Sequence, residues 1–392
     1  MTAMKAITAP RIFDADNTRQ GHAVLYRGDT VVDVVPLSDV PDDVQIARFE
    51  SGMIVPGFVD LQVNGGGGVL LNDAPSVETI RIICRAHAQF GTTALLPTLI
   101  TDSREATIQA IDAAADAVAA MVPGCIGLHL EGPHLSQARR GAHDATLVRP
   151  ADHQDIDRLI AASDRISHLL VTVAPEAVSN AQIEILSKAG ICVSLGHSDA
   201  DCSTAIEAMR AGACLVTHLF NAMSPLGHRA PGMVGAALSY GGVSAGLIAD
   251  GIHIDPVTLG VAIRAKTGPG KLFLVTDAMS TIGSTRKSFA LNGRTVYSSN
   301  GRLTLEDGTL AGADIDMMAS VRLLVNKVVV DVEEALRMAS LYPAKAIRAA
   351  SRHGRIGEGS ASDLVHLSDD LEISRVWIGG KSVFPVKQQT SE

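Results

Sequence analysis

Eight short runs of residues typical of buried strands alternate with helix-like segments through the middle of this 392-residue chain. The runs are Phe58–Val63, Thr93–Leu99, Ile126–Glu131, Leu169–Ala174, Cys192–His197, Cys214–Leu219, Ser244–Ala249 and Leu272–Asp277. Between most of them lie Ala-rich amphipathic segments, such as 77–90, 104–121 and 200–211. Strands that alternate with helices are typical of parallel βαβ units. Eight such units in succession therefore predict an α/β fold, the (β/α)8 TIM barrel.

An open doubly wound sheet is the main alternative, and the glycines do not favour it. No Gly-x-Gly-x-x-Gly follows the first run to open a helix, as a dinucleotide-binding sheet requires. The glycine run 65–68 also lacks the Lys-Ser/Thr pair of a phosphate-binding loop. Only 3% of the residues are aromatic, so the core must rest on Val, Ile, Leu and Ala. A parallel sheet that is buried on both faces suits this composition.

The two ends of the chain have a different pattern. Short strands separated by turns are predicted over residues 4–55 and again over about 356–386. Neither stretch is long enough to form a stable core alone. We therefore expect both ends, 1–55 and 356–392, to pair into one small β-sandwich domain beside a barrel domain of residues 56–355.

The segment that follows the eighth run predicts an insertion into the barrel. Residues 284–312 contain two Asn-Gly pairs between short polar strands, a strong hairpin signal. We expect a β-hairpin insert over the barrel mouth. Two helices should follow, over about 314–327 and 331–349, with the second ending or kinking near Tyr342-Pro343 because proline breaks the helical hydrogen-bond pattern.

Charge and composition exclude several classes of protein. The formal net charge is −9 and no run of Lys or Arg suggests a nucleic-acid surface, so no nucleic-acid partner is expected. No uncharged stretch of about 18 apolar residues predicts a membrane span, and residues 1–20 do not resemble a signal peptide. The five scattered cysteines are expected to be reduced thiols in a cytoplasmic protein. An anionic substrate would need a local positive site against the overall charge.

Polar side chains gather at the carboxyl ends of the predicted strands, which is the face of a TIM barrel where active sites form. Glu131, His197 and His218 lie at the ends of the third, fifth and sixth runs. Two imidazoles and one carboxylate can hold a divalent ion and leave a position open, as in catalytic zinc sites. A single strand-end histidine is more often bonded to a backbone carbonyl, but three converging groups favour a metal centre.

Three further residues are candidates for chemistry or binding. Asp277 ends the eighth run, where a carboxylate can take a proton from water and return it to a leaving amine; the alternative is a structural Asp bonded to backbone amides. Arg229 suits bidentate binding of a phosphate, or it is a solvated loop charge. His143 could polarise a carbonyl, or it could cap a turn.

Five segments together carry a family resemblance, although each is a weak signal alone. They are His129-Leu130-Glu131-Gly132-Pro133, Leu195-Gly196-His197-Ser198, Thr217-His218-Leu219-Phe220-Asn221-Ala222-Met223, Ala249-Asp250-Gly251-Ile252-His253 and Leu274-Val275-Thr276-Asp277-Ala278. In combination they resemble the N-acetylglucosamine-6-phosphate deacetylases of the amidohydrolase superfamily. The resemblance runs from about Pro56 to Ile347.

The resemblance implies a role for each of these positions. Glu131, His197 and His218 would ligate the metal, while Asp277 would be the acid and base and His143 a second catalytic residue. The substrate would be bound by Ala142 and His143 near the acetamide, by Asn221, Ala222 and Arg229 at the phosphate, by Asp250, Gly251, Ile252 and His253 at the sugar, and by Leu310, Ala311 and Gly312 in a facing loop. In relatives the arginine can come from the partner subunit, so the resemblance implies a homodimer.

The sequence departs from many amidohydrolases after the first strand. Those enzymes carry a His-x-His motif that builds a two-metal site, whereas this chain has Gln62 and Asn64. Amides are poor zinc ligands beside imidazole. We therefore expect one divalent metal ion, Zn²⁺ in the first instance, with Fe, Co or Mn as alternatives for the same ligands. A weak second site stays open.

The expected reaction is hydrolysis of the N-acetyl group of N-acetylglucosamine 6-phosphate, giving glucosamine 6-phosphate and acetate in amino-sugar catabolism. Other N-acyl substrates are alternatives: N-acetylgalactosamine 6-phosphate, or an N-acyl amino acid whose carboxylate Arg229 would bind. A non-catalytic barrel scaffold is the alternative from a different class. The presence of all four candidate metal and acid/base side chains disfavours it, and metal analysis of the purified protein separates the two.

Overall fold

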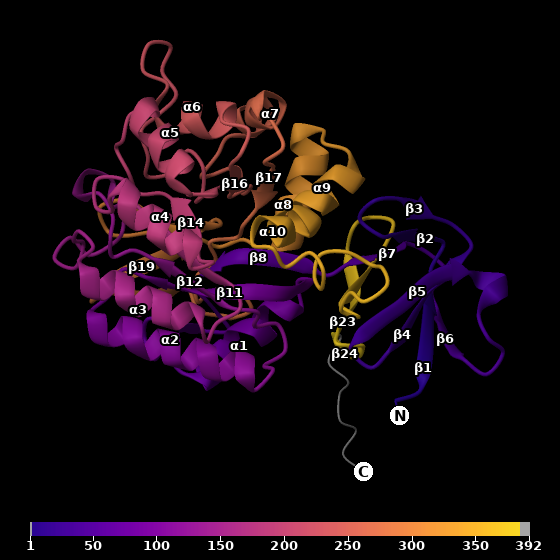
Figure 1. Cartoon of the computed structure of the whole chain (residues 1–392). Coiled ribbons are helices and arrows are strands. Elements are labelled where there is room, and N and C mark those ends of the chain that lie inside the picture. The colour runs from indigo at the N-terminus through magenta and orange to yellow at the C-terminus, as the bar shows by residue number, and fades with distance from the viewer. Residues whose placement is uncertain (1, 385–392) are drawn as a thin grey trace.

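The computed structural model describes residues 2–384, and its centre is a parallel barrel (Figure 1). Eight strands form one sheet in chain order: β8 (Phe58–Val63), β11 (Thr92–Ile100), β12 (Leu128–Glu131), β13 (Leu169–Val173), β14 (Cys192–Leu195), β15 (Leu215–Val216), β16 (Ser244–Leu247) and β17 (Leu272–Leu274). The first and last strands meet at a seam, where the Asp277 N–H donates to the Gln62 carbonyl at 2.9 Å. The predicted TIM barrel is confirmed.

Several barrel strands are shorter than their apolar runs. The runs reach His197, Leu219 and Asp277, but β14, β15 and β17 end two to three residues earlier. The reason is local backbone geometry, because His197, His218 and Asp277 have φ values of 49°, 28° and 51°. A left-handed residue ends the extended conformation, and for a residue other than glycine it is strained. The same three residues were predicted to form the site.

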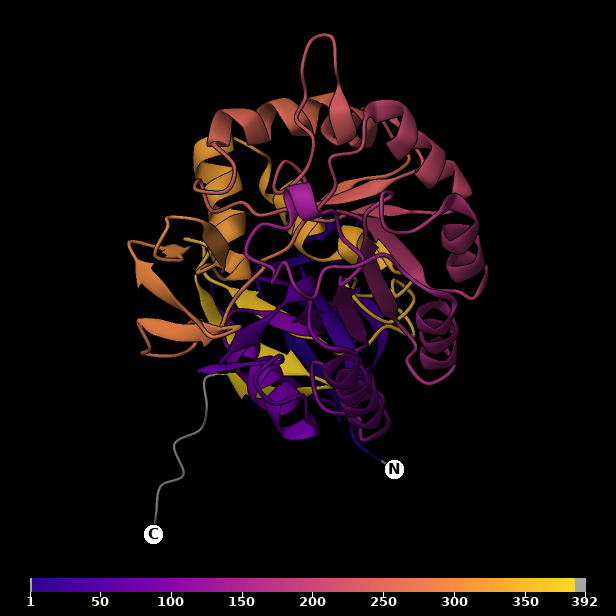
Figure 2. The same ribbon diagram turned by 90° about the vertical axis from the view of Figure 1, so that its left-hand side faces the viewer.

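Helices surround the strands in a ring, which Figure 2 shows together with the loops at the barrel mouth. They are α1 (Val77–Ala88), α2 (Arg104–Ala119), α3 (His153–Ser163), α4 (Asn180–Lys188), α5 (Cys202–Ala211), α6 (Gly232–Ser239) and α7 (Pro256–Ala265). Two short 3-10 turns are also present: η2 (Gln137–Arg139) follows the third barrel strand, and η1 (Leu37–Asp39) lies outside the barrel in the N-terminal part of the chain. Side-chain caps begin most of the helices: Ser76 and Ser103, for example, accept N–H bonds at the starts of α1 and α2. No helix within residues 2–384 is long and apolar enough to span a bilayer.

The two helices predicted after the insert are both present, each in two parts. The first is α8 (Met317–Leu323), which continues as the π-helical turn η3 (Leu324–Val328). The second is split at Ser340 into α9 (Val332–Ala339) and α10 (Leu341–Ala346). Pro343 has no N–H to bond to the carbonyl one turn earlier, which accounts for the break. The chain therefore continues beyond a kink.

Strands from both chain ends form two sheets beside the barrel (Figure 1). One has the order β5 (Thr30–Pro36), β4 (His22–Arg27), β1 (Met4–Thr8), β6 (Gln45–Arg48), and the other the order β24 (Lys381–Phe384), β23 (Ile373–Ile378), β22 (Leu364–Leu367), β7 (Met53–Pro56), β2 (Arg11–Phe13), β3 (Thr18–Arg19). Val24 and Ile54 meet Leu364 and Trp377 in one buried cluster. The domain limits 1–55 and 356–392 stay a prediction, and residues 1 and 385–392 lie outside the described part.

The insert is a four-stranded antiparallel sheet that lies beside the barrel mouth, in orange in Figure 2. Its strands are β18 (Ser288–Leu291), β19 (Arg294–Ser299), β20 (Arg302–Thr304) and β21 (Leu310–Ala313), and the short pair β9 (Gly65–Gly66) and β10 (Val69–Leu70) lies after β8. Asn292 and Asn300 both have positive φ, as a two-residue hairpin turn needs. Phe289 and Leu303 pack with Met279 of the barrel in a separate small core. This core anchors the insert above the barrel.

A buried histidine gives the fold a predicted acid sensitivity. His87 on α1 is fully buried with its Nε2 at 2.9 Å from the Gly65 carbonyl, and burial lowers its pKa from 6.5 to about 4. The unfolded chain therefore binds this proton more tightly, so stability is lost as the pH falls from 6.5 towards 4. We expect His87→Gln to remove about 2 kcal/mol of the stability difference between pH 7 and pH 5, measured by urea unfolding. An unchanged pH dependence would contradict this.

Candidate active site

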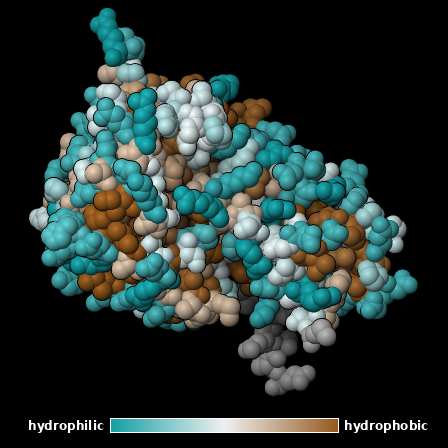
Figure 3. Space-filling model, in the orientation of Figure 1, coloured by the Kyte–Doolittle hydropathy of each residue, from teal (hydrophilic) through white to brown (hydrophobic). Residues whose placement is uncertain are grey.

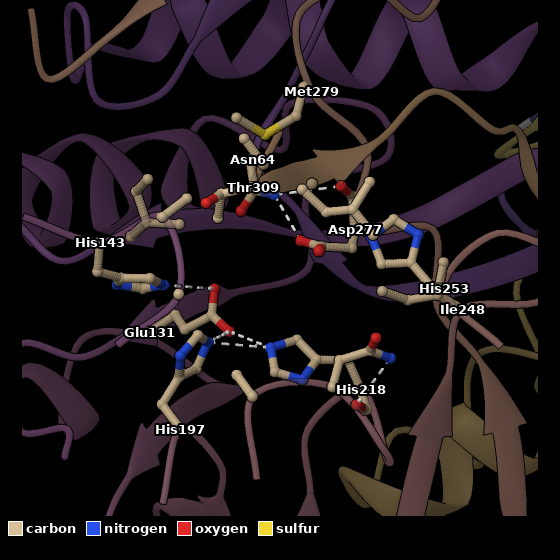
Figure 4. Close-up of a pocket in the computed structure, with 18 of the residues that line it drawn as sticks. Asn64, Glu131, His143, His197, His218, Ile248, His253, Asp277, Met279 and Thr309 are labelled. Carbon is tan, nitrogen blue, oxygen red and sulfur yellow. Dashed lines mark hydrogen bonds and ion pairs between the residues drawn. The ribbon is translucent and has the colours of Figure 1, made fainter. Parts of the chain in front are cut away.

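Three side chains from three barrel strands meet at the carboxyl end of the barrel (Figure 4). Glu131 ends β12, His197 follows β14 and His218 follows β15. The Nε2 atoms of His218 and His197 lie 3.0 Å and 3.3 Å from Glu131 Oε1, and they are 3.1 Å apart. All three side chains are almost completely buried. The fold therefore brings together the three residues predicted to ligate a metal.

The chemistry of this donor set fits a divalent metal ion. Around a tetrahedral ion with ligands at about 2.0–2.1 Å, neighbouring ligand atoms are about 3.3 Å apart, close to the separations seen here. The Nδ1 atom of His197 lies 2.9 Å from the Arg139 carbonyl, which can only accept, so Nε2 carries the lone pair. A cation is the group that best satisfies a carboxylate and two imidazole nitrogens that face one another.

His143 is a neighbour of this set and forms an overlapping one. One ligand-type atom each from Glu131, His143 and His197 lies within 4.8 Å of the others. The His143 Nε2 is 3.9 Å from Glu131 Oε2, farther than either histidine above, and its Nδ1 is 2.7 Å from the Thr101 hydroxyl. Burial, followed by the charge of His197, lowers the pKa of His143 to about 3. His143 is therefore neutral and faces the cavity.

Asp277 lies across the cavity from these histidines and is held by two amides (Figure 4). Its Oδ1 accepts from Asn64 Nδ2 at 2.6 Å and from Gln62 Nε2 at 3.1 Å. Gln62 Nε2 also donates to Glu131 Oε1 at 3.0 Å. Burial raises the pKa of Asp277 to about 6, and the nearby charge of Glu131 adds to this. Of the two amides that replace the His-x-His motif, Gln62 therefore bridges and orients both carboxylates, while Asn64 orients Asp277 alone.

Below the site, a chain of hydroxyl groups and one imidazole crosses the inside of the barrel. His129 Nε2 lies 2.7 Å from the Thr172 hydroxyl, which is 2.7 Å from that of Thr217, and Ser194 is 2.6 Å from Thr217. All four side chains are buried, and burial lowers the pKa of His129 to about 4. Because each buried polar group has a partner, the network is a rigid floor for the residues above it.

A cavity of about 390 Å³ opens above the site and brings most of the predicted substrate residues together. Those that line it are Ala142, His143, Asn221, Ala222, His253, Leu310, Ala311 and Gly312, together with Glu131, His197, His218 and Asp277. It is also lined by residues that sequence reasoning did not assign: Asn64, Ile100, Ala138, Arg139, Gly141, Ile248, Met279, Leu291 and Thr309. Several of these residues are next to recognised motifs in the sequence, and this proximity was the signal that could have identified them. Leu291 lies far from every recognised motif in the sequence and carries no such signal.

Asp250, Gly251 and Ile252 do not line the cavity, although they were predicted to contact the sugar. Asp250 instead orients His253, because its Oδ2 is 2.6 Å from His253 Nδ1 and its Oδ1 accepts the His253 N–H at 2.7 Å. Burial would raise the pKa of Asp250, but the bond to His253 outweighs this and the pKa is lowered. The carboxylate therefore directs the other ring nitrogen of His253 towards the cavity.

Arg229 does not reach this cavity within the chain. It is exposed on the loop 225–231 that precedes α6, and this loop stands out from the body of the molecule with hydrophilic side chains at its tip (Figures 1 and 3). Among the residues that line the cavity the cation is Arg139, which is paired with Asp199 at 2.8 Å. Within this one chain, Arg229 is therefore not part of the candidate site.

Comparison with known proteins agrees with the geometry. The model of the amidohydrolase family matches residues 53–383. N-acetylgalactosamine-6-phosphate deacetylase of Shewanella sp. (strain ANA-3) is 43% identical over 341 residues, which cover 87% of this chain and 86% of that protein. N-acetylglucosamine-6-phosphate deacetylase of Haemophilus influenzae is 35% identical over 362 residues, covering 92% and 94%.

A solved structure is similar over nearly the whole chain. The crystal structure of N-acetylglucosamine-6-phosphate deacetylase from Pasteurella multocida superposes with a TM-score of 0.93 at 35% identity, covering 97% of this chain and 99% of that one. The resemblance found in the motifs is thereby confirmed. This chain belongs to the amidohydrolase family, and it is a metal-dependent hydrolase.

Proposed function

We propose that this enzyme hydrolyses the N-acetyl group of N-acetylglucosamine 6-phosphate, giving glucosamine 6-phosphate and acetate in amino-sugar catabolism. The observation that carries the proposal is the meeting of Glu131, His197, His218 and Asp277 at one cavity. The names of the relatives support the substrate class. The cavity of about 390 Å³ also lies in the size range of small-molecule sites.

In the proposed mechanism Glu131, His197 and His218 hold one divalent ion, with Zn²⁺ expected and Fe, Co or Mn fitting the same ligands. When bound, this ion acts as a Lewis acid towards the acyl oxygen and the attacking water. Asp277 takes the proton of the water through its carboxylate and returns it to the departing amine. The Thr101 hydroxyl can donate to His143 Nδ1, which leaves the Nε2–H of His143 to polarise the acyl oxygen.

Substrate contacts are proposed from the lining of the cavity. His253, directed by Asp250, would bond a sugar hydroxyl. Asn221 and Ala222, at the end of the sixth strand, would bind the phosphate, and the segment Leu310 to Gly312 would cover the sugar. We also propose a cytoplasmic location, which the five free cysteines support, because thiols stay reduced in that compartment.

The sugar epimer is the one point on which a second candidate is supported. A relative at 43% identity is a deacetylase of N-acetylgalactosamine 6-phosphate, which differs from the glucosamine compound at one hydroxyl. Steady-state assays of both epimers, beside an N-acyl amino acid, test the proposal. We expect turnover of the glucosamine compound and none of the amino acid. A higher kcat/KM for the galactosamine compound would reassign the substrate, and a metal-free protein without activity on any of the three would favour the scaffold.

We further propose a homodimer in which Arg229 of one chain binds the substrate phosphate in the cavity of the other. The protruding loop 225–231 and the exposure of Arg229 support this, because the cavity lacks a free cation of its own among the described residues. We expect Arg229→Ala to raise KM about 10-fold or more, the value of a charge-assisted hydrogen bond, with kcat little changed.

The measurement for Arg229 combines kinetics with light scattering. Arg264→Ala, which removes another exposed arginine on α7, is the matched control and should leave KM unchanged. A monomer in solution, or an unchanged KM in the Arg229 variant of a dimer, would overturn the assignment.

A further inference from the structure

The segment between β12 and α3 forms a closed loop, residues 134–149, whose two ends meet. The Arg149 N–H donates to the Pro133 carbonyl at 3.0 Å, and His134 Nδ1 lies 3.2 Å from the Arg149 carbonyl. The only regular structure within the loop is the short turn η2. A compact surface loop with adjacent ends has the form of an Ω-loop, and such loops are frequently functional.

This loop touches the candidate metal centre at several atoms. The Arg139 carbonyl accepts from Nδ1 of His197, and the Ser136 N–H donates to the His197 carbonyl, both at 2.9 Å. Ala142 and His143, farther along the loop, line the cavity. The orientation of His197 and the place of His143 therefore both depend on the path of the loop. Gln137 donates to the Ala145 and Val148 carbonyls within the loop, and contacts at the ends of the loop add to these bonds.

A single buried carboxylate holds both ends of the loop. Asp155 on α3 has a side chain that is 4% exposed. Its Oδ1 accepts from Arg149 at 2.9 Å, a second nitrogen of Arg149 bonds its Oδ2, and His134 Nε2 lies 3.9 Å from the same oxygen. Arg104 on α2 and Arg158 on α3 approach within 3.4 Å. Asp155 therefore binds Arg149, the last residue of the loop, whose backbone carbonyl in turn lies at 3.2 Å from Nδ1 of His134, the first residue.

The electrostatics explain why this contact is strong. Burial alone would raise the pKa of Asp155, but the bidentate bond from Arg149 and the Asp152 N–H overcome the effect and keep the carboxyl ionised. A buried carboxylate that loses its partner is strongly destabilising, whereas a fork-like arginine pair is among the more directional contacts in proteins. Breaking this pair should release the ends of the loop before it affects the barrel core.

We propose that Asp155 is a positioning residue for the reaction, which acts by closing the 134–149 loop through Arg149 and thereby orients His197 and His143. The inference rests on the proposed deacetylase function for its kinetic readout. The structural readout does not depend on the proposed function, since loop closure can be measured without substrate. Neither Asp155 nor Arg149 lines the cavity, so their effects must reach the substrate through the loop.

The test compares Asp155→Asn, Arg149→Gln and Arg149→Lys with the wild-type enzyme. We expect Asp155→Asn and Arg149→Gln each to lower kcat about 10-fold, the size of effect that outer partners of metal ligands have, with a smaller change in KM. Hydrogen exchange should accelerate in peptides that span residues 134–149. The double variant should lose no more than either single variant, and Arg149→Lys should restore part of kcat.

The matched control is Asp112→Asn, which breaks the exposed pair between Asp112 on α2 and Arg165, two residues after the end of α3. It should leave kcat and the exchange of the loop unchanged. Arg149 is about one-third exposed, so its variants should fold even if Asp155→Asn does not. Unchanged kcat and unchanged loop exchange in the Arg149→Gln variant would overturn the proposal, as would faster exchange spread over the whole barrel with a normal kcat. A wild-type enzyme without deacetylase activity refutes the proposed function, while the exchange data still decide loop closure.

Discussion

Asp277→Asn should lose about 10³-fold in kcat, in the range that general acid–base catalysis contributes. The amide has nearly the size of the carboxylate, and its oxygen can still accept the hydrogen bonds from Gln62 and Asn64. It cannot, however, take a proton from water and return it to the leaving amine. The loss should therefore fall on kcat and leave KM within a few fold, because ground-state contacts with the sugar are unchanged.

Two controls make this result specific. The Asp277→Asn protein should bind the same amount of metal as the wild type, measured by elemental analysis, since Asp277 is not one of the three proposed ligands. Asp314→Asn removes a carboxylate that bonds Thr281 and Ser298, outside the residues that line the cavity, and should keep normal kinetics. Near-normal turnover by Asp277→Asn would refute its assignment as the acid and base.

Glu131→Gln should have the second largest effect, by removing the one anionic ligand of the proposed metal set. Outer partners of metal ligands are worth about 10–100-fold in affinity, so loss of a ligand should weaken metal binding by more than about 100-fold. The two histidines would remain only 3.1 Å apart without the carboxylate between them. Titration of the metal-free protein with Zn²⁺ measures the change directly, without reference to catalysis.

The same titration separates the two overlapping ligand sets. His218→Gln should weaken metal binding as strongly as Glu131→Gln, whereas His143→Gln should leave it nearly intact and lower kcat. Glu184→Gln, an exposed glutamate on α4, should change neither. Strong metal binding by His218→Gln, together with its loss in His143→Gln, would transfer the third ligand from His218 to His143.

The barrel could be predicted because each strand carries its own signal. The run Leu169–Ala174, which is apolar apart from Thr172, becomes β13 with a change of one residue at its end, since burial on both faces of a parallel strand is visible in the local sequence. The ends of the strands were less predictable. His197 and His218 adopt left-handed backbone conformations that no local propensity favours, and they hold these conformations because the surrounding barrel fixes them.

The candidate site was predictable where it depends on the order of the barrel strands. It was less predictable where it depends on the packing of segments that are far apart in the sequence. Glu131 and His218 could be expected to meet because the carboxyl ends of barrel strands converge. Leu291 reaches the cavity because the insert packs on the barrel, which is a tertiary contact without a sequence signal. Arg229 was expected at the phosphate, but it does not line the chain's own cavity, and the position of its loop depends on tertiary structure that the local sequence does not show.

The hydroxyl and imidazole chain inside the barrel restricts how this enzyme can change over time. Replacing Thr172 by valine would remove the partner of His129 Nε2 and would leave the Thr217 hydroxyl with Ser194 alone. A buried polar group left without a partner lowers the stability of the fold by more than its hydrogen bond contributed, whereas replacing all the bonded residues by apolar ones of the same shape can be almost neutral. Substitutions at these interior positions should therefore occur together or not at all. Homologous sequences should have either all of these polar residues or none of them.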